Sequence, residues 1–356
     1  MYIQIPMKTI QAFIGSIMLI TIAGCAQLYK SENTVATSLP KQEKFSVIFG
    51  GTDVGKLLVN RDTNNINIDF SFSNNGRGAS SNETLTLTDT GLPIDWRITG
   101  KTVFGNEVNE QFSLQGNMAN WQSSAEKGSA KFNNTPIYIA QNSSPYSLYI
   151  YAKALLNQAN KSLPAFPSGE LTITQVDTVK LSDINNNLTN AVIYAINGIE
   201  LDPSYIALDE SQHMLAYLSP RFVVIREGFE KQNKLLSDLA ATLNASRFEK
   251  IAKKTTHQYK KPVRINNVKI FDPINLQLTS SKSVLIQNDK IIAIESSVDS
   301  AQNGEVFIDG NGGTLIPGLY EMHGHMSDND ALLNVMAGVT SVRDMGNEIE
   351  ILDPLI

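Results

Sequence analysis

Two stretches in the first half of the chain alternate strictly between polar and apolar residues, Ile66–Phe72 and Thr84–Thr88. Because successive side chains of a strand point to opposite faces, this pattern is typical of strands with one buried and one exposed face. Turn-forming clusters rich in Asn and Gly separate such stretches at short intervals. The sequence therefore predicts a mostly β, antiparallel domain over residues 45–228 that curls into a roll or half-barrel.

This predicted domain contains one helix and one misleading motif. Pro145 precedes an apolar run that predicts a helix over Tyr146–Gln158. Gly50–Lys56 matches the phosphate-binding pattern G-x-x-x-x-G-K. Leu57 stands where that motif needs Ser or Thr, and a strand rather than a helix follows, so we interpret the stretch as a glycine-rich hairpin turn. A sheet of this kind can also hold an apolar ligand on its concave side.

A short apolar run near the C-terminus leads into two histidines. The run, Leu315–Met322, contains Pro317 and Gly318, and His323 and His325 follow it; the whole chain has only four histidines. Side chains at i and i+2 of a strand share a face, so the end of this strand aims two imidazoles at one point. Imidazole suits zinc and other transition metals. The pattern predicts two ligands of one divalent metal ion, with zinc as the first choice.

The order of segments around these histidines resembles the beginning of the amidohydrolase superfamily, the metal-dependent hydrolases related to imidazolonepropionase and dihydroorotase. Upstream, Val284–Ser297 and Val306–Gly318 resemble the small β-domain of that family, and downstream Ala331–Asn347 resembles its first barrel helix and second barrel strand. The resemblance covers about residues 262–356. It implies a small β-domain over residues 262–314, followed over residues 315–356 by the first βαβ unit of a truncated (β/α)₈ barrel.

The residues after the histidines agree with a helix between two parallel strands. Ser327–Asp330 has the form of a capping box, Ala331–Ala337 is apolar at helical spacing, and Gly338 is a helix stop. Val339–Asp344 then predicts the second strand, and such a unit requires a crossover connection. The resemblance implies that the active face lies at the carboxyl ends of these strands.

The chain ends at Ile356, whereas a complete (β/α)₈ barrel needs about 250 residues. No histidine follows His325. We therefore expect the chain to be the front part of a longer enzyme, and we assign no catalytic residue within it. Two imidazoles, even with help from Asp328 or Asp344, would form a weak and solvent-open site.

The resemblance implies that metal-activated water attacks a C–N bond of a small-molecule substrate, such as an amide, a cyclic amide or a dipeptide-like compound. The competing hypothesis is a lipid-anchored periplasmic binding protein, in which the β-rich domain holds a ligand and the hydrolase-like remnant is inert. The residues that would bind substrate are not specified by the sequence, because they lie on loops that vary within a fold.

Five other polar or aromatic side chains have plainer interpretations. Asp344 is expected to cap a loop or to pair with Arg343. His213 is expected at the surface after a turn, and His257 in an exposed basic linker. Both tryptophans, Trp96 and Trp121, are expected in the core of the sheet.

The first 25 residues have the form of a signal peptide. Lys8 supplies the positive charge, Ile10–Ile22 is the apolar segment, and Cys25 follows an Ile-Ala-Gly sequence that resembles a bacterial lipobox. Cys25 is the only cysteine in the chain, and the apolar run is too short to favour a transmembrane anchor. We therefore predict lipidation of Cys25 and attachment to the cell envelope, at the outer membrane facing the periplasm.

The rest of the chain is predicted to connect these parts. Residues 26–44 are polar and read as a flexible tether, and residues 229–261 as a helix followed by a basic linker, with the helical pattern spanning Arg226–Ile251. The net charge is −6, with no long basic run, so the sequence does not indicate nucleic-acid binding.

Overall fold

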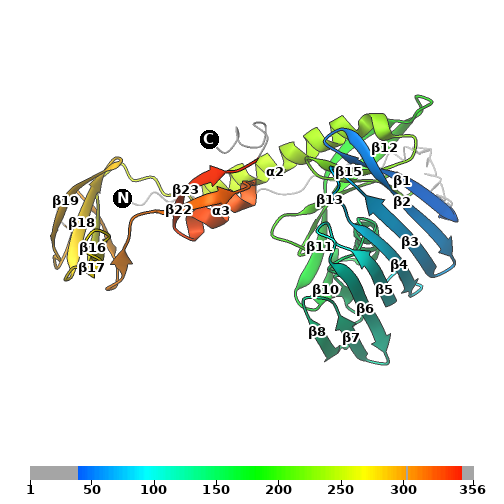
Figure 1. The fold of residues 1–356 in the computed structure, drawn as a ribbon, viewed down its shortest axis with the longest axis horizontal. Helices are drawn as coiled ribbons and strands as arrows, with labels where there is room; N and C mark the ends of the chain where they lie inside the picture. Colours follow the sequence, from blue (N-terminus) through cyan, green and yellow to red (C-terminus); the bar gives the residue numbers. More distant parts are fainter. Residues whose placement is uncertain (1–38, 302–303, 347–356) are drawn as a thin grey trace, which may run out of the picture. The chain divides into compact units, whose positions relative to one another are not determined.

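The computed structural model describes residues 39–301 and 304–346, so the predicted signal peptide and most of the predicted tether lie outside the described residues. The described residues form a large β-domain (residues 39–255), a small β-domain (residues 263–315) and a βαβ unit (residues 319–344) (Figure 1). None of the helices in these described ranges is long and apolar enough to cross a membrane.

The large β-domain contains fifteen strands in one sheet and three helical segments. The strands are β1 (Gln42–Phe49), β2 (Thr52–Asp62), β3 (Asn65–Phe72), β4 (Ser80–Leu87), β5 (Pro93–Lys101), β6 (Glu107–Gln115), β7 (Met118–Gln122), β8 (Lys127–Lys131), β9 (Ile137–Tyr138), β10 (Ser162–Phe166), β11 (Glu170–Ser182), β12 (Leu188–Asn197), β13 (Ser204–Leu208), β14 (Met214–Leu218) and β15 (Phe222–Arg226). The helical segments are α1 (Ser147–Leu156), the 3₁₀ helix η1 (Glu230–Gln232) and α2 (Asn233–Thr255).

The strand order of this sheet is β8-β7-β6-β5-β4-β3-β2-β1-β15-β14-β13-β12-β11-β10-β9. Neighbouring strands are antiparallel except β9 and β10, so the sheet is two meanders joined where β1 pairs with β15. Phe112 of β6 stacks on Tyr138 of β9 with ring centroids 4.5 Å apart, and Trp121 of β7 stacks on Phe166 of β10 at 5.2 Å. These contacts join the two ends of the strand order. The prediction of a mostly β, antiparallel domain is confirmed.

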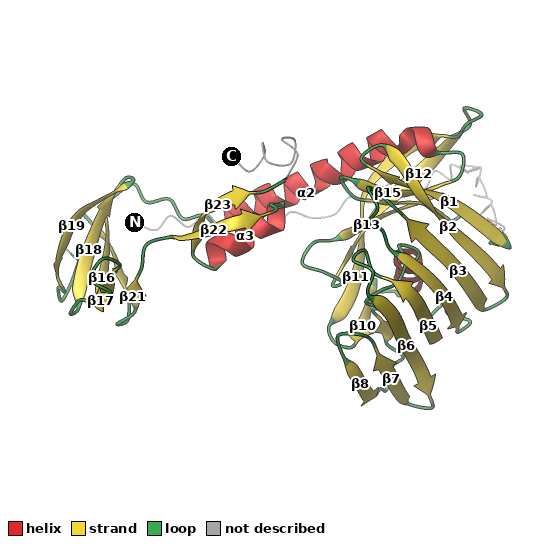
Figure 2. Ribbon diagram, viewed as in Figure 1, coloured by secondary structure: helices red, strands yellow, loops and turns green. Residues whose placement is uncertain are grey.

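The inner face of the sheet is filled by helix α1. Strands β3, β4 and β6 bury every second residue, as the alternation predicted. Their buried side chains form one core cluster with Tyr146, Tyr149 and Leu155 from the α1 region (Figure 2). The predicted helix over Tyr146–Gln158 is therefore confirmed as α1. The helix occupies the concave side on which the sequence allowed an apolar ligand.

Strands β13, β14 and β15 are buried on both faces. Their second face packs in another cluster with Leu236 and Ala240 of α2. Burial on both faces explains why these strands are continuously apolar rather than alternating. The helix predicted over Arg226–Ile251 starts later than expected, at Asn233, because Arg226 ends strand β15, which hydrogen-bonds to β1.

The structure shows where the predicted β-rich domain begins and how its first two strands are connected. Strand β1 begins at Gln42, inside the stretch predicted as tether. Gly50 and Gly51 both have positive φ and join β1 to β2 by a two-residue turn, since Phe49 faces Thr52. A two-residue turn with positive φ at both positions is the favoured hairpin connection. The predicted hairpin turn is therefore confined to Gly50 and Gly51, the rest of the stretch belongs to β2, and the segment is not a phosphate-binding loop.

The small β-domain contains β16 (Val263–Asp272), β17 (Gln277–Leu278), β18 (Lys282–Gln287), β19 (Lys290–Ser296), β20 (Val306–Asp309) and β21 (Thr314–Leu315), in one sheet. Its core contains a buried arginine. Arg264 is 1% exposed, and its guanidinium donates to both carboxylate oxygens of Glu305, at 2.7 and 2.9 Å, and to Glu295 at 2.8 Å. These two carboxylates compensate the buried charge and raise the pKa of Arg264.

The βαβ unit consists of β22 (Leu319–Gly324), α3 (Asp328–Met336) and β23 (Val339–Asp344). The two strands are parallel, as predicted. Ser327 and Asp330 form the predicted capping box at the start of α3. The first strand is shorter than predicted, because Leu315 belongs to β21 and pairs with β16 of the small β-domain. The described residues contain this single βαβ unit, and the larger barrel stays a prediction.

Candidate functional site

The two predicted metal ligands are neighbours at the carboxyl end of β22. His323 is in the strand, His325 lies one residue beyond its end, and both side chains are exposed. Their ring centroids are 5.4 Å apart and the ring planes meet at 70°. The structure therefore brings the two imidazoles together, as expected from their spacing in a strand.

Two glycines let β22 approach β23 closely. A Cβ atom at Gly324, between the histidines, would lie 2.6 Å from Cγ1 of Val342. A Cβ atom at Gly318 would lie 2.1 Å from Oγ1 of Thr340. A side chain at Gly324 would therefore collide with Val342 of β23. The glycine of the H-G-H sequence is thus required by strand packing.

Asp344, at the end of β23, fixes the loop that follows the histidines. Its Oδ2 accepts a hydrogen bond from the backbone N–H of Met326 at 2.8 Å, and its Oδ1 accepts one from Gly346 at 2.9 Å. The carboxylate thereby connects the loop after β22 to the end of β23. The expectation that Asp344 caps a loop is confirmed.

The histidine pair fits part of a zinc site. Two imidazoles bound to one tetrahedral zinc at about 2.0–2.1 Å place their ring centroids roughly 5 Å apart, which matches the observed spacing. Among the side chains that the structure describes, which do not include that of Asp328, no group of three or more His, Cys, Asp or Glu is placed to hold a metal. The pair therefore supplies two donors, and the third protein ligand of a catalytic zinc is not among the residues that the structure describes.

The other residues that the sequence singled out do not contribute to the histidine pair. His213 is half-buried, with Nδ1 3.8 Å from Oδ2 of Asp209, so its expected surface position is only partly correct. His257 is exposed, as predicted. Trp96 is fully buried and Trp121 is half-buried, as expected for the sheet core. Cys25, the predicted lipidation site, lies outside the described residues.

Sequence reasoning missed three buried carboxylates in the large β-domain. Glu43, Glu83 and Glu110 lie on β1, β4 and β6, and their exposed fractions are 5%, 2% and 1%. Each occupies an apolar position of an alternating strand: Glu110, for example, lies between Val108 and Phe112 on the inner face. These positions could have been recognised in the sequence, because a charged residue at a buried position of an alternating strand needs a hydrogen-bonding or ionic partner.

The partners of two of these carboxylates are in the segment Tyr138–Ser144, which precedes α1. Glu110 accepts hydrogen bonds from the Tyr138 hydroxyl at 2.8 Å and from the backbone N–H groups of Gln141 and Asn142. Glu83 accepts from the Ser144 N–H at 2.5 Å and from the Trp96 indole. Burial raises the pKa of Glu83, and these hydrogen bonds oppose the shift. The two carboxylates fix this segment to the inner face of the sheet.

Glu43 connects β1 to the α1 region and to two arginines. Its Oε2 accepts a hydrogen bond from the Tyr146 hydroxyl at 2.6 Å and forms an ion pair with Arg61 at 2.9 Å. Arg226 lies 3.9 Å from Oε1. Burial is the largest cause of the raised pKa of Tyr146, so this phenol stays protonated.

Comparison with known proteins gives one partial similarity in sequence. A dihydroorotase from Elusimicrobium minutum is 36% identical over 64 residues, which are 18% of this chain. The match spans only 14% of that protein's length. No family model matches the chain.

Two solved structures resemble the fold only loosely. One is a β-barrel-like protein from Brucella abortus, from a domain family of unknown function, with a TM-score of 0.32 and 11% identity over 52% of this chain and 93% of that one. The other is a protein from Pseudomonas aeruginosa, from another such family, with a TM-score of 0.31 and 12% identity over 56% of this chain and 96% of that one.

Proposed function

We propose that the βαβ unit supplies part of a metal-dependent hydrolase site that acts on carbon–nitrogen bonds. The observation that carries the proposal is the pair of neighbouring imidazoles at the end of β22, 5.4 Å apart between ring centroids. The partial similarity to a dihydroorotase supports the same class of enzyme. The proposed substrates are small molecules with an amide, cyclic amide or dipeptide-like bond.

In this proposal His323 and His325 hold one divalent ion, with zinc as the first choice. When bound, such an ion lowers the pKa of a water molecule to about 7 and polarises the scissile carbonyl. The chain orders this site by fixing the loop after His325 through Asp344. Because two imidazoles supply fewer than the three protein ligands of catalytic zinc, we expect the 356-residue chain by itself to hydrolyse little.

The test is an assay of the protein purified from its own cells, together with the polypeptides that co-purify. Hydrolysis of linear and cyclic amides is measured before and after treatment with a chelator, and after Zn²⁺ is restored. His323→Ala and His325→Ala should each abolish the metal-dependent activity, whereas His257→Ala, a change at an exposed histidine elsewhere, should not. Amide hydrolysis that survives both of the first two changes would contradict the proposal.

We also propose that the mature protein is anchored to the cell envelope through lipid on Cys25. The Ile-Ala-Gly-Cys sequence after an apolar segment supports this proposal. In a Gram-negative host, the wild-type protein should sediment with membranes, and Cys25→Ser should be released or remain unprocessed. Mass spectrometry is the deciding measurement: an intact N-terminus without lipid on the wild type would refute the anchor.

The competing hypothesis of an apolar ligand on the concave side of the sheet receives less support. Helix α1 and its tyrosines occupy that side and belong to the main core cluster. A ligand there would have to displace side chains that are fully buried, such as Tyr146 and Leu155.

A further inference from the structure

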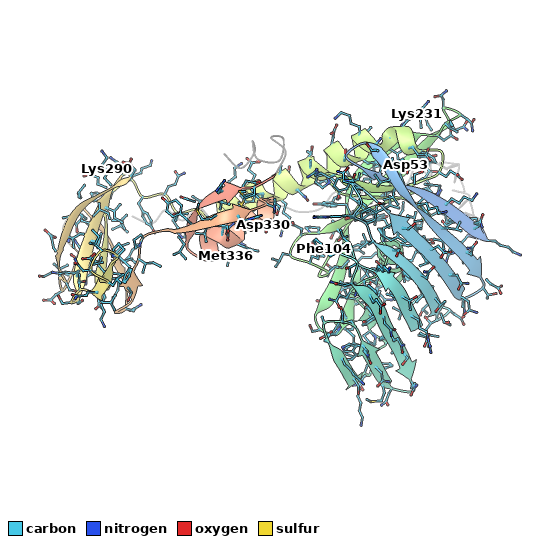
Figure 3. The ribbon with its side chains drawn as sticks, in the orientation of Figure 1. Asp53, Phe104, Lys231, Lys290, Asp330 and Met336 are labelled. Carbon is cyan, nitrogen blue, oxygen red and sulfur yellow. The ribbon has the colours of Figure 1, made fainter. Side chains whose placement is uncertain are left out.

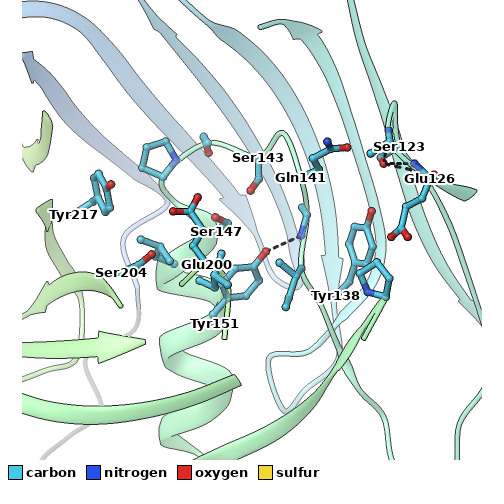
Figure 4. Close-up of a pocket in the computed structure, with 18 of the residues that line it drawn as sticks. Ser123, Glu126, Tyr138, Gln141, Ser143, Ser147, Tyr151, Glu200, Ser204 and Tyr217 are labelled. Atoms are coloured by element: carbon cyan, nitrogen blue, oxygen red, sulfur yellow. Dashed lines mark hydrogen bonds between the residues drawn. The ribbon is translucent and has the colours of Figure 1, made fainter. Parts of the chain in front are cut away.

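The large β-domain contains an open cavity of about 490 Å³ that the proposed hydrolase function does not use. Its wall is built from the turn between β7 and β8, the segment that precedes α1, the loop before β13, and the region of Tyr217 and Phe222 (Figure 4). Its volume falls in the range of about 300–1,000 Å³ that is usual for small-molecule sites. The cavity is therefore large enough for a small organic ligand.

The charges around this cavity are negative. Glu126 and Glu200 line it, and none of its described lining residues is Lys or Arg. Behind the wall, Glu110 accepts hydrogen bonds from Tyr138 and Gln141, which line the cavity. Within residues 39–301 and 304–346, Glu110 forms no ion pair with a basic side chain. A cation in the cavity would therefore face carboxylates and no fixed positive charge.

Aromatic rings supply the apolar part of the wall. Tyr138, Tyr151, Tyr217 and Phe222 line the cavity. Burial is the largest cause of the raised pKa of Tyr138 and of Tyr217, so both phenols stay neutral. The faces of such rings attract cations electrostatically. Aromatic rings and carboxylates in one lining favour a ligand that has a cationic group on a short apolar body.

One buried serine of the wall is held by a carboxylate. Ser144 is 1% exposed and lines the cavity. Its backbone N–H donates a hydrogen bond to Glu83, and hydrogen bonding by its side chain also lowers the pKa of that carboxyl. This part of the wall is therefore fixed to the sheet before any ligand binds.

We propose that this cavity binds a small organic cation, an amine carried on an aromatic or short aliphatic group. Glu126 and Glu200 attract the cationic group, and the aromatic wall contacts the apolar body. The buried carboxylates Glu83 and Glu110 hold this wall rigid before binding, which lowers the entropic cost of association. The site is separate from the histidine pair, and its function does not depend on metal.

Three matched probes test the charge requirement on the full chain by isothermal titration calorimetry. They are 2-phenylethylamine, its neutral analogue 2-phenylethanol, and the anion 3-phenylpropionate. The amine should bind, the alcohol should bind roughly tenfold more weakly, and the anion more weakly still. Added salt should weaken binding of the amine. Equal binding of the amine and the alcohol, or no binding of the amine, would overturn the proposal.

Two neutralising changes test the location of the site. Glu200→Gln and Glu126→Gln should each weaken amine binding roughly two- to fivefold, because both carboxylates are exposed and act through solvent. Glu107→Gln removes the same charge from an exposed position outside the cavity lining and should leave the affinity unchanged. Tryptophan fluorescence checks that the variants are folded. If Glu107→Gln weakens binding as much as Glu200→Gln, the amine does not occupy this cavity.

Discussion

Strands β14 and β22 are both rich in apolar residues, but the large β-domain buries the first and the βαβ unit exposes the second. In Met214–Leu218 four of five residues are buried, whereas in Leu319–Gly324 five of six are exposed. Strand β14 pairs with neighbours on both sides and packs between two core clusters. Among the described strands, β22 pairs only with β23. The comparison shows that a parallel pair with one helix cannot bury its own apolar surface.

The same contrast extends to helix α3. Val335 and Met336 are 71% and 75% exposed. Met336 is labelled in Figure 3. In the large β-domain, α1 instead buries eight of its ten residues. Exposed apolar surface of this kind marks a place where other protein normally packs. The large β-domain thus has a core of its own, whereas the βαβ unit leaves much of its apolar surface exposed.

Hydrogen exchange should show the largest difference between the two regions. Amides of β14 should exchange only on global unfolding, whereas amides of β22 should exchange through local opening, roughly a thousandfold or more faster. Exchange of peptides from the full chain, followed by mass spectrometry, measures both in one sample. Equal protection of the two strands would mean that β22 is covered in solution, and the comparison would fail.

A core phenylalanine should matter far more than an exposed one. Phe112 is 1% exposed and stacks on Tyr138, so Phe112→Ala should lower the free energy of unfolding of the large β-domain by about 3–5 kcal/mol. Phe104 is 80% exposed, and Phe104→Ala should change that free energy by less than about 0.5 kcal/mol. Urea unfolding followed by tryptophan fluorescence reports on this domain, which contains both tryptophans. Similar midpoints for the two variants would argue against the described core.

A smaller effect is expected at the capping box of α3. Ser327→Ala should remove the hydrogen bonds with Asp330 and destabilise the helix by about 1 kcal/mol. Because the helix has little packing to support it, the loss should appear as faster amide exchange within α3. Ser327→Asn keeps a good capping residue and is the matched control. The structure would be wrong at this end of the helix if the alanine and asparagine variants exchanged alike.

Local patterns were sufficient to predict the regular parts of the molecule. Alternation located β3 and β4, and the helical pattern located α1, because each depends on one buried face. Strand β15 was not predicted as a strand, and the helical pattern was placed from its last residue, Arg226, although α2 begins at Asn233. Its partner β1 is distant in sequence, and an apolar run of that length is ambiguous without this partner.

The candidate site was only partly predictable for a similar reason. The i, i+2 spacing of His323 and His325 was enough to predict that their rings would be neighbours. The buried carboxylates and the cavity they support were not foreseen. Their partners, such as Gln141 for Glu110, become neighbours only when the sheet curls around the segment that precedes α1.

Zinc binding by the histidine pair is the most direct test of the proposed hydrolase site. The full chain is titrated with Zn²⁺ by calorimetry as the wild type and as the His323→Ala, His325→Ala and His257→Ala variants. The structure predicts weak binding of one zinc ion that is lost in each of the first two variants and kept in the third. Unchanged zinc binding in His323→Ala or in His325→Ala, or no zinc binding by the wild type, would contradict the assignment of these two residues as metal ligands.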